Sequence, residues 1–147
     1  MTDRSPDGIP IPDPVRAFLD DTRYASLATL DPDGIPRPVV TWYTLDGDSI
    51  VLNSAVGRRW PTNLLRDPRM SVTVIDASDA YRWVGMTGTA ERIGDQARAQ
   101  ADIAAMARRY RAADPEGAER TITERYQRQE RISFRFRPLT IYDYDDR

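Results

Sequence analysis

Hydrophobic and polar residues alternate over several short segments, and this pattern predicts β-strands. The expected strands cover residues 24–30, 36–45, 49–53, 70–75, 81–93 and 131–137. The first two turns between them carry typical turn residues, Asp31-Pro32-Asp33-Gly34 for a type I turn and Asp46-Gly47 for a tight hairpin. Two consecutive hairpins favour an antiparallel meander over a parallel sheet. Gly85 and Gly88 interrupt the fifth strand and indicate a bulge or a close approach of another backbone.

Helical periodicity accounts for four further segments. Asp13-Pro14 reads as an N-cap followed by proline, after which Val15, Phe18 and Leu19 share one face. Helices are also expected over 61–66, after Gly94-Asp95, and after Asp114-Pro115. The proline-rich residues 1–13 show little pattern and predict a flexible arm. Residues 14–147 then form a single domain.

The predicted fold is mainly β, of the α+β kind: a six-stranded antiparallel split β-barrel with short covering helices. A chain of 147 residues has the size of one domain and can bury one core. A closed or partly split barrel is favoured over a two-sheet sandwich, because a small barrel removes the exposed edges that a meander leaves open.

The composition removes most side-chain chemistry. The sequence contains no Cys, His or Lys, so all 21 basic residues are Arg. Thiolate nucleophiles, His bases, His or Cys zinc sites and Schiff-base lysines are therefore excluded, and no catalytic residue or metal ligand is assigned. A net charge of −2 argues against nucleic-acid binding. The sequence has neither an apolar run long enough for a membrane span nor a signal-peptide pattern, so we expect a cytoplasmic protein.

Three segments resemble a known family: YASLATLDPDGIPRPVVTWY, NSAVGRRWPTNLLRDPR and YRWVGMTGTAERI. They are similar to the flavin-reductase-like, FMN-binding split barrels of the pyridoxamine 5'-phosphate oxidase-like superfamily, and within it to the branch that uses the deazaflavin coenzyme F420. The resemblance covers about residues 14–138. Its most specific part is the basic loop that leads into Asn63-Leu64 and Arg66-Asp67-Pro68-Arg69. The first hairpin is shared across the superfamily and does not separate the cofactors.

The resemblance implies a homodimer with the cofactor in a groove between the subunits. The ring would lie along Val39, Val40 and Thr41, and the phosphate beside the loop after the third strand. Arg58 and Arg59 follow a flexible glycine there and can present two guanidinium groups to a phosphate. The full set of candidate cofactor-binding residues is Val39, Val40, Thr41, Asn53, Ser54, Arg58, Arg59, Trp60, Asn63, Tyr81 and Trp83.

Five aromatic residues have open roles. Many relatives carry Lys where this chain has Trp60, a departure that shifts the anionic contact onto the arginines. Trp60 itself is either a stacking wall or a core residue. Tyr81 and Trp83 are packing residues or, by similarity, reach the cofactor of the partner subunit. Trp42 and Tyr43 alternate in direction, so one should face the core and the other the groove.

The expected activity is that of an F420-dependent oxidoreductase. It would move a hydride between reduced F420 and a small organic acceptor such as an enone, a quinone or a tetrapyrrole. The reactive atoms belong to the cofactor, which agrees with the absence of His, Cys and Lys. Two alternatives stay open: an FMN-dependent oxidase or reductase of the same fold, and a non-enzymatic F420- or flavin-binding carrier protein.

Overall fold

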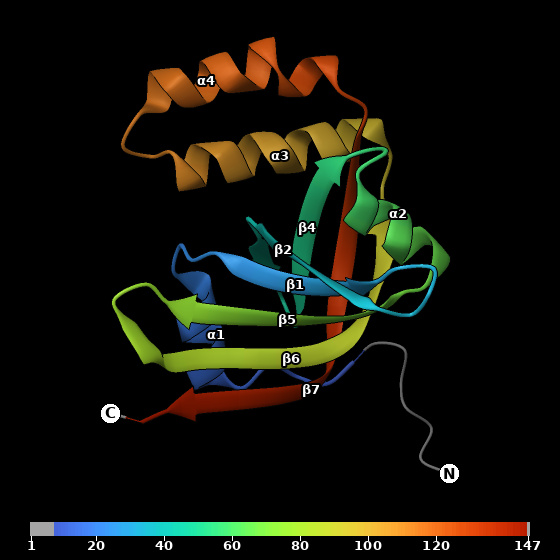
Figure 1. Cartoon of the computed structure of the whole chain (residues 1–147). Helices are drawn as coiled ribbons and strands as arrows, with labels where there is room; N and C mark the ends of the chain where they lie inside the picture. Colours follow the sequence, from blue (N-terminus) through green and yellow to red (C-terminus); the bar gives the residue numbers. More distant parts are fainter. Residues whose placement is uncertain (1–7, 147) are drawn as a thin grey trace.

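The computed structural model describes residues 8–146 and contains one open antiparallel sheet. Across these residues the strands are β1 (Ala25–Leu30), β2 (Pro36–Thr41), β3 (Thr44–Asp46), β4 (Ser49–Ala55), β5 (Arg69–Asp76), β6 (Asp79–Ile93) and β7 (Arg131–Asp145). They are ordered β2-β1-β5-β6-β7-β4-β3, so β2 and β3 form the two edges (Figure 1). The mainly β split barrel is confirmed, with seven strands in place of the six expected.

Four helices flank the sheet. They are α1 (Asp13–Asp20), α2 (Arg59–Arg66), α3 (Gln96–Tyr110) and α4 (Pro115–Glu124), and a single 3-10 turn, η1 (Tyr126–Arg128), follows α4. Helices α3 and α4 lie side by side at one end of the molecule (Figure 1). The helices expected after Gly94-Asp95 and Asp114-Pro115 are present, and Asp95 and Asp114 cap them, each accepting a hydrogen bond from a backbone N–H of the first turn. Asp13 does not cap α1, because the helix already begins at Asp13 and Pro12 takes the cap position.

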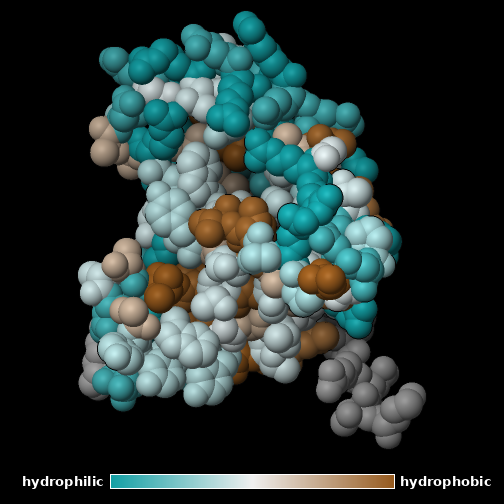
Figure 2. Space-filling model, viewed as in Figure 1, coloured by the Kyte–Doolittle hydropathy of each residue, from teal (hydrophilic) through white to brown (hydrophobic). Residues whose placement is uncertain are grey.

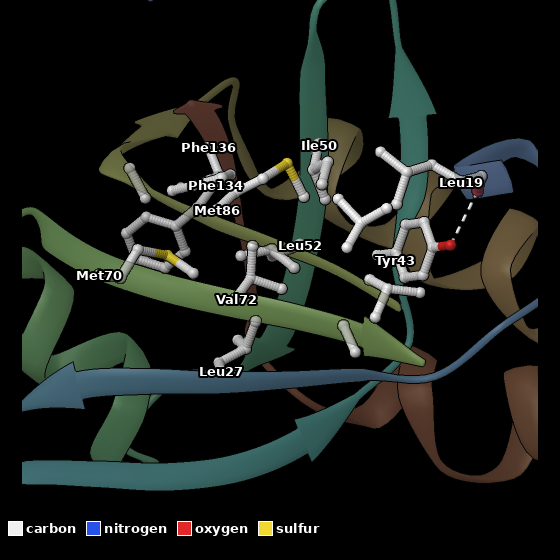
Figure 3. Packing of buried hydrophobic residues seen from close by; sticks show 14 of the residues in the cluster. Leu19, Leu27, Tyr43, Ile50, Leu52, Met70, Val72, Met86, Phe134 and Phe136 are labelled. Atoms are coloured by element: carbon white, nitrogen blue, oxygen red, sulfur yellow. Dashed lines mark hydrogen bonds between the residues drawn. The ribbon is translucent and has the colours of Figure 1, made fainter. Parts of the chain in front are cut away.

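The predicted single strand over 36–45 is wrong, because the chain leaves the first hairpin at Trp42 and Tyr43. Strand β2 pairs with β1, whereas β3 pairs only with β4 at the opposite edge of the sheet. Tyr43 holds this crossing, since its side chain is fully buried and its hydroxyl donates a hydrogen bond of 2.8 Å to the Leu19 carbonyl (Figure 3). The two hairpins exist, but they do not form a continuous meander. Local alternation could not reveal a break that depends on this long-range contact.

One hydrophobic core fills the space inside the bent sheet. Leu27 and Val72 come from β1 and β5, and Leu52 and Phe134 from β4 and β7 (Figure 3). The strands of the two groups run nearly crosswise in Figure 1. The residues just before α1 belong to this core as well, because Ile11 is buried. Of the predicted arm, residues 1–7 lie outside the described residues.

The pairing of β6 and β7 is irregular at Gly88, where the two backbones approach closely. The pairing register of these two strands shifts between Thr87 and Gly88. A Cβ atom on Gly88 would lie 2.2 Å from the carbonyl oxygen of Arg137, so only glycine fits at this position. The close backbone approach expected at Gly88 is therefore confirmed. It lets β7 pair with β4 in its first half and with β6 along most of its length.

Helix α2 is tied to the first hairpin by buried polar contacts. The Asn63 amide nitrogen donates to Thr29 Oγ1 at 3.1 Å and to Asp31 Oδ1 at 3.0 Å. Asp31 also forms ion pairs with Arg37 at 3.0 Å and with Arg59 at 3.6 Å. The hydrogen bond from Asn63, together with the two arginines, holds the pKa of Asp31 below its usual value near 3.8. Asp31 is thus the anionic centre of the link between α2 and β1.

The close approach at Gly88 predicts that Gly88→Ala destabilises the protein by at least about 2 kcal/mol, because the added methyl group would push β6 and β7 apart. Urea unfolding of both proteins measures the difference. Gly85→Ala is the matched control in the same strand. Its Cβ would meet only the ring of Trp83, a side chain that can move. Equal effects of the two substitutions would contradict this account of the bend.

The lowered pKa of Asp31 predicts an acid-sensitive contribution to stability. This contribution is present above about pH 4 and is lost as the pH falls through the folded-state pKa. Asp31→Asn should therefore flatten the loss of stability between about pH 4 and pH 2, as measured by urea unfolding at each pH. Glu124→Gln removes an exposed carboxylate without an ion pair among the described residues and should leave the profile unchanged.

Candidate functional site

A groove occupies the split of the barrel, between the edge of β2 and the second half of β4. Strand β3 covers β4 only as far as Val51, so the outer edge of residues 52–55 stays open. The part of the groove next to α2, here called the loop section, has a volume of about 280 Å³. It is lined by Arg37, Pro38, Val39, Val40, Thr41, Asn53, Ser54, Arg58, Arg59 and Trp60. Eight of the eleven predicted cofactor-binding residues therefore come together here.

The groove continues toward α3 and η1 as a second part, here called the helix section. It has a volume of about 240 Å³ and is lined by Tyr24, Val40, Thr41, Trp42, Asn53, Arg58, Ile103, Met106, Arg125, Tyr126 and Arg131. The two sections share Val40, Thr41, Asn53 and Arg58. Trp42 lines this section whereas Tyr43 is in the core, as their alternation predicts.

Strand β2 offers backbone groups to the groove. It is an edge strand, paired with β1 on one side only, so the backbone groups along its other side have no strand partner, although Pro36 and Pro38 contribute no N–H. Val40 is 67% exposed, whereas Val39 packs against the core. In Figure 2 this part of the surface is pale to hydrophobic, in contrast to the hydrophilic layer over α3 and α4. A planar ring can lie along such an edge and accept or donate backbone hydrogen bonds.

Ser54 has a buried hydroxyl without a protein partner. The residue is 2% exposed, and its Oγ forms no hydrogen bond with the described residues. Leaving a buried hydroxyl unpaired costs free energy, so such a group indicates a missing partner. Because Ser54 lines the loop section, a ligand in the groove can supply that partner.

The two loop arginines have different surroundings. Arg58 is exposed and forms no ion pair within residues 8–146, and its backbone serves as the N-cap of α2. Arg59 lies 3.6 Å from Asp31 and is partly neutralised. Arg58 is therefore the loop cation that is free to meet an anion in the groove.

Trp60 and Asn63 contribute to the structure around the groove. Trp60 is only 6% exposed and its ring packs against Phe134 with centroids 6.0 Å apart, which makes it a core residue at the base of the loop section. Asn63 is buried on the other side of α2, in the link to Asp31, and does not line the groove.

Tyr81 and Trp83 lie outside the groove of their own chain. Trp83 stacks on Tyr142 and Tyr144 of β7, with ring centroids 5.3 and 5.4 Å apart. Tyr81 is 65% exposed. A role of this aromatic cluster at the groove of a partner subunit stays a prediction.

Arg131, which was not predicted as a site residue, is the most deeply buried cation at the groove. Arg131 is 4% exposed, and its Nε and Nη2 donate to Asn53 Oδ1 at 3.0 and 2.8 Å. Asn53 in turn donates to the Ala99 carbonyl and to Ser133 Oγ, so its amide is fully used and positions Arg131. Burial, with repulsion from Arg58 and Arg125, lowers the pKa of Arg131 to about 10. The guanidinium stays charged at neutral pH.

The role of Arg131 could not be predicted, because Arg131, Arg135 and Arg137 alternate with apolar residues in the same way along β7. Arg135 and Arg137 occupy equivalent positions along β7 and pair with Asp46 and Glu91. The start of β7 differs because α3 and η1 cover it, which a local pattern does not reveal.

Residues 8–146 contain neither a membrane-spanning helix nor a cluster of metal-binding side chains. Within them, no helix is long and apolar enough to cross a membrane. The same residues contain no group of three or more acidic side chains suited to a metal ion.

Comparison with known proteins places the chain in a family. No curated protein matches the sequence significantly. The fold is similar to that of an F420 reductase, with a TM-score of 0.71 and 22% identity over 90% of this chain and 98% of that one. A conserved hypothetical protein from Mycobacterium tuberculosis gives a TM-score of 0.74 and 22% identity over 99% and 91%. The haem storage protein HutZ from Vibrio cholerae gives 0.69 and 19% over 92% and 96%.

These similarities between solved structures, all below 25% identity, support the fold. The family model described as pyridoxamine 5'-phosphate oxidase matches residues 11–144, a range that includes both sections of the groove. The chain belongs to the pyridoxamine 5'-phosphate oxidase family.

Proposed function

We propose that the groove binds coenzyme F420 and that the protein moves a hydride between reduced F420 and a small organic acceptor. The observation that carries this proposal is the loop section itself. It combines an open strand edge with the Arg58 guanidinium and the Ser54 hydroxyl, neither of which has a side-chain partner among residues 8–146. The similarity in fold to an F420 reductase supports the choice of cofactor.

The residues of the loop section fit a cofactor that carries a phosphate. Arg58 can bind phosphate oxygens through two N–H groups, each charge-assisted contact contributing about 1.5–3 kcal/mol. Ser54 would donate its hydroxyl hydrogen to the same phosphate and so satisfy its buried oxygen. The edge of β2 would hold the ring. When bound, the cofactor supplies the hydride chemistry, and the chain orients it and keeps water away.

FMN is the second candidate cofactor, because the family takes its name from an oxidase of pyridoxamine 5'-phosphate and an edge strand beside an anion site suits FMN equally. Haem is a weaker candidate despite the haem-storing neighbour. The chain has no His or Cys, which leaves Tyr and Met as side chains for axial ligation. A carrier role is distinguished from catalysis by turnover of reduced F420 with a panel of enones and quinones.

The different surroundings of the two arginines predict different effects on cofactor binding. Arg58→Ala should weaken F420 binding about ten- to a hundredfold, because one strong anion contact is lost. Arg59→Ala should change it by less than about threefold, because Asp31 already neutralises this side chain. Fluorescence titrations at low and high salt measure both effects, and the loss for Arg58→Ala should shrink at high salt.

Parallel titrations with FMN and riboflavin complete this test. Riboflavin lacks the phosphate and should bind wild type and Arg58→Ala equally. Equal weakening of FMN and riboflavin by Arg58→Ala would contradict the phosphate assignment. If FMN binds much more tightly than F420, the cofactor is FMN and the assignment of F420 is wrong.

We also propose that the protein is a homodimer whose partner subunit completes the groove. The outer face of the sheet is shallow and mostly apolar around Ala28, Leu30 and Leu139. Exposed Tyr81 and Tyr142 continue this face. Because no helix within residues 8–146 covers this face, a second copy that packs there would bury it and bring the Trp83 cluster near the groove of its partner.

The dimer proposal predicts a mass of about twice 16.7 kDa in light scattering. It also predicts that Trp83→Ala lowers cofactor affinity, although Trp83 lies outside the groove of its own chain. Arg120→Ala, an exposed change on α4, should leave both properties unchanged. A monomer at micromolar concentration with full cofactor affinity would contradict the proposal.

A further inference from the structure

We propose that the helix section of the groove is a second anion site, in which Arg131 and Arg125 bind the carboxylate of a small planar organic acid. Its location beside the loop section makes this acid the acceptor in the proposed reaction. Only that role as acceptor rests on the proposed function, because the binding site follows from the residues of the helix section alone.

Arg131 is a buried cation without a counterion. Among the described residues, no carboxylate forms an ion pair with it, although it is only 4% exposed. Arg82 provides the contrast: it is 6% exposed and pairs with Asp143 at 2.6 Å. A buried charge without an opposite charge is unfavourable. A carboxylate of the chain thus neutralises Arg82, whereas an external anion would neutralise Arg131.

The guanidinium of Arg131 is held in place and still has free donors. Three of its N–H groups donate, two to Asn53 and one to Gln129 Oε1 at 2.7 Å. Since a guanidinium has five N–H groups, two remain, one on each terminal nitrogen. A carboxylate can accept such a pair of hydrogen bonds with its two oxygens.

A relay of hydrogen bonds fixes this orientation from behind. Ser133 Oγ donates to Asp102 at 2.7 Å and accepts from the Asn53 amide at 3.0 Å. The Asn53 oxygen therefore faces Arg131, while the negative charge of Asp102 stays two side chains away. The network positions the cation without neutralising it.

The surroundings of Arg131 are positively charged. Arg58 and Arg125 also line the helix section, and neither forms an ion pair within the described part of the chain. Burial is the main cause of the lowered pKa of Arg131, and repulsion from both of these arginines adds to it. No Asp or Glu is present in this lining. Three arginines thus face one small space, which favours an anionic ligand.

The rest of the lining is aromatic and apolar, which indicates the shape of the ligand. Trp42 is fixed by stacking on Tyr110, with ring centroids 5.0 Å apart and an interplanar angle of 11°. The Arg131 guanidinium lies over the ring of Tyr126, with its Cζ atom 4.9 Å from the ring centroid. The volume of about 240 Å³ is below the roughly 300–1,000 Å³ of sites for drug-sized ligands. A small unsaturated or aromatic monocarboxylic acid fits these conditions.

Cinnamate and its neutral analogue cinnamamide test the proposal with the full-length protein. Calorimetric titration should show that cinnamate binds at least about tenfold more tightly than cinnamamide, because only cinnamate carries the charge. Arg131→Gln should weaken cinnamate binding about tenfold or more, and Arg125→Ala about three- to tenfold. Arg120→Ala, an exposed arginine on α4, is the matched control and should have no effect.

Equal affinity for cinnamate and cinnamamide would overturn the proposal, as would unchanged cinnamate binding in both arginine variants. Inorganic phosphate that binds the helix section as tightly as cinnamate would overturn the assignment to a planar acid. If Arg131→Gln does not fold, as judged by circular dichroism, Arg125→Ala and the cinnamamide comparison decide.

F420 and FMN titrations with the same proteins separate this proposal from the proposed function. Cofactor binding without cinnamate binding overturns only the acid site. Cinnamate binding that depends on Arg131, without binding of either cofactor, overturns only the proposed function.

Discussion

The contact between Gly88 and the carbonyl of Arg137 sets the shape of the whole molecule. Because no side chain separates these two backbones, β6 and β7 bend together, and the sheet turns over on itself around one core. The same bend leaves the sheet open, since β2 and the second half of β4 face each other without pairing. The groove is this unpaired gap. Its backbone groups are available to a ligand because the fold gives them no strand partner.

The two ends of this gap differ in charge. At the hairpin side, Asp31 neutralises Arg37 and Arg59 and ties α2 to β1. Farther along the groove, Arg58, Arg125 and Arg131 have no such carboxylate among the described residues. The lowered pKa of Arg131 means that its charged form is less favourable in the folded protein than in the unfolded chain. A bound anion would offset this cost, so ligand binding and stability are linked.

Local patterns were sufficient for the parts of the protein that depend on neighbouring residues. The hairpin turns, the caps at Asp95 and Asp114 and the basic loop before α2 follow from residues within a few positions of one another. The crossing at Tyr43 and the burial of Arg131 do not. The hydrogen bond from Arg131 to Asn53 joins residues 78 positions apart, so no periodicity could distinguish Arg131 from the half-buried Arg135. Arg59 and Asn63 were predicted at the loop for the same local reason, and the distant Asp31 determines their contacts.

The exclusive use of arginine also determines how the groove responds to pH. Arginine stays protonated throughout the physiological range, and Arg131, with a pKa near 10, is no exception at neutral pH. The charge of the groove is therefore constant between about pH 5 and pH 8. A carboxylate or a phosphodiester also keeps its charge over this range, whereas a phosphomonoester gains a second negative charge near pH 6. Any pH dependence of anion binding in this range then originates in the ligand, and its presence or absence identifies the kind of anion that the groove holds.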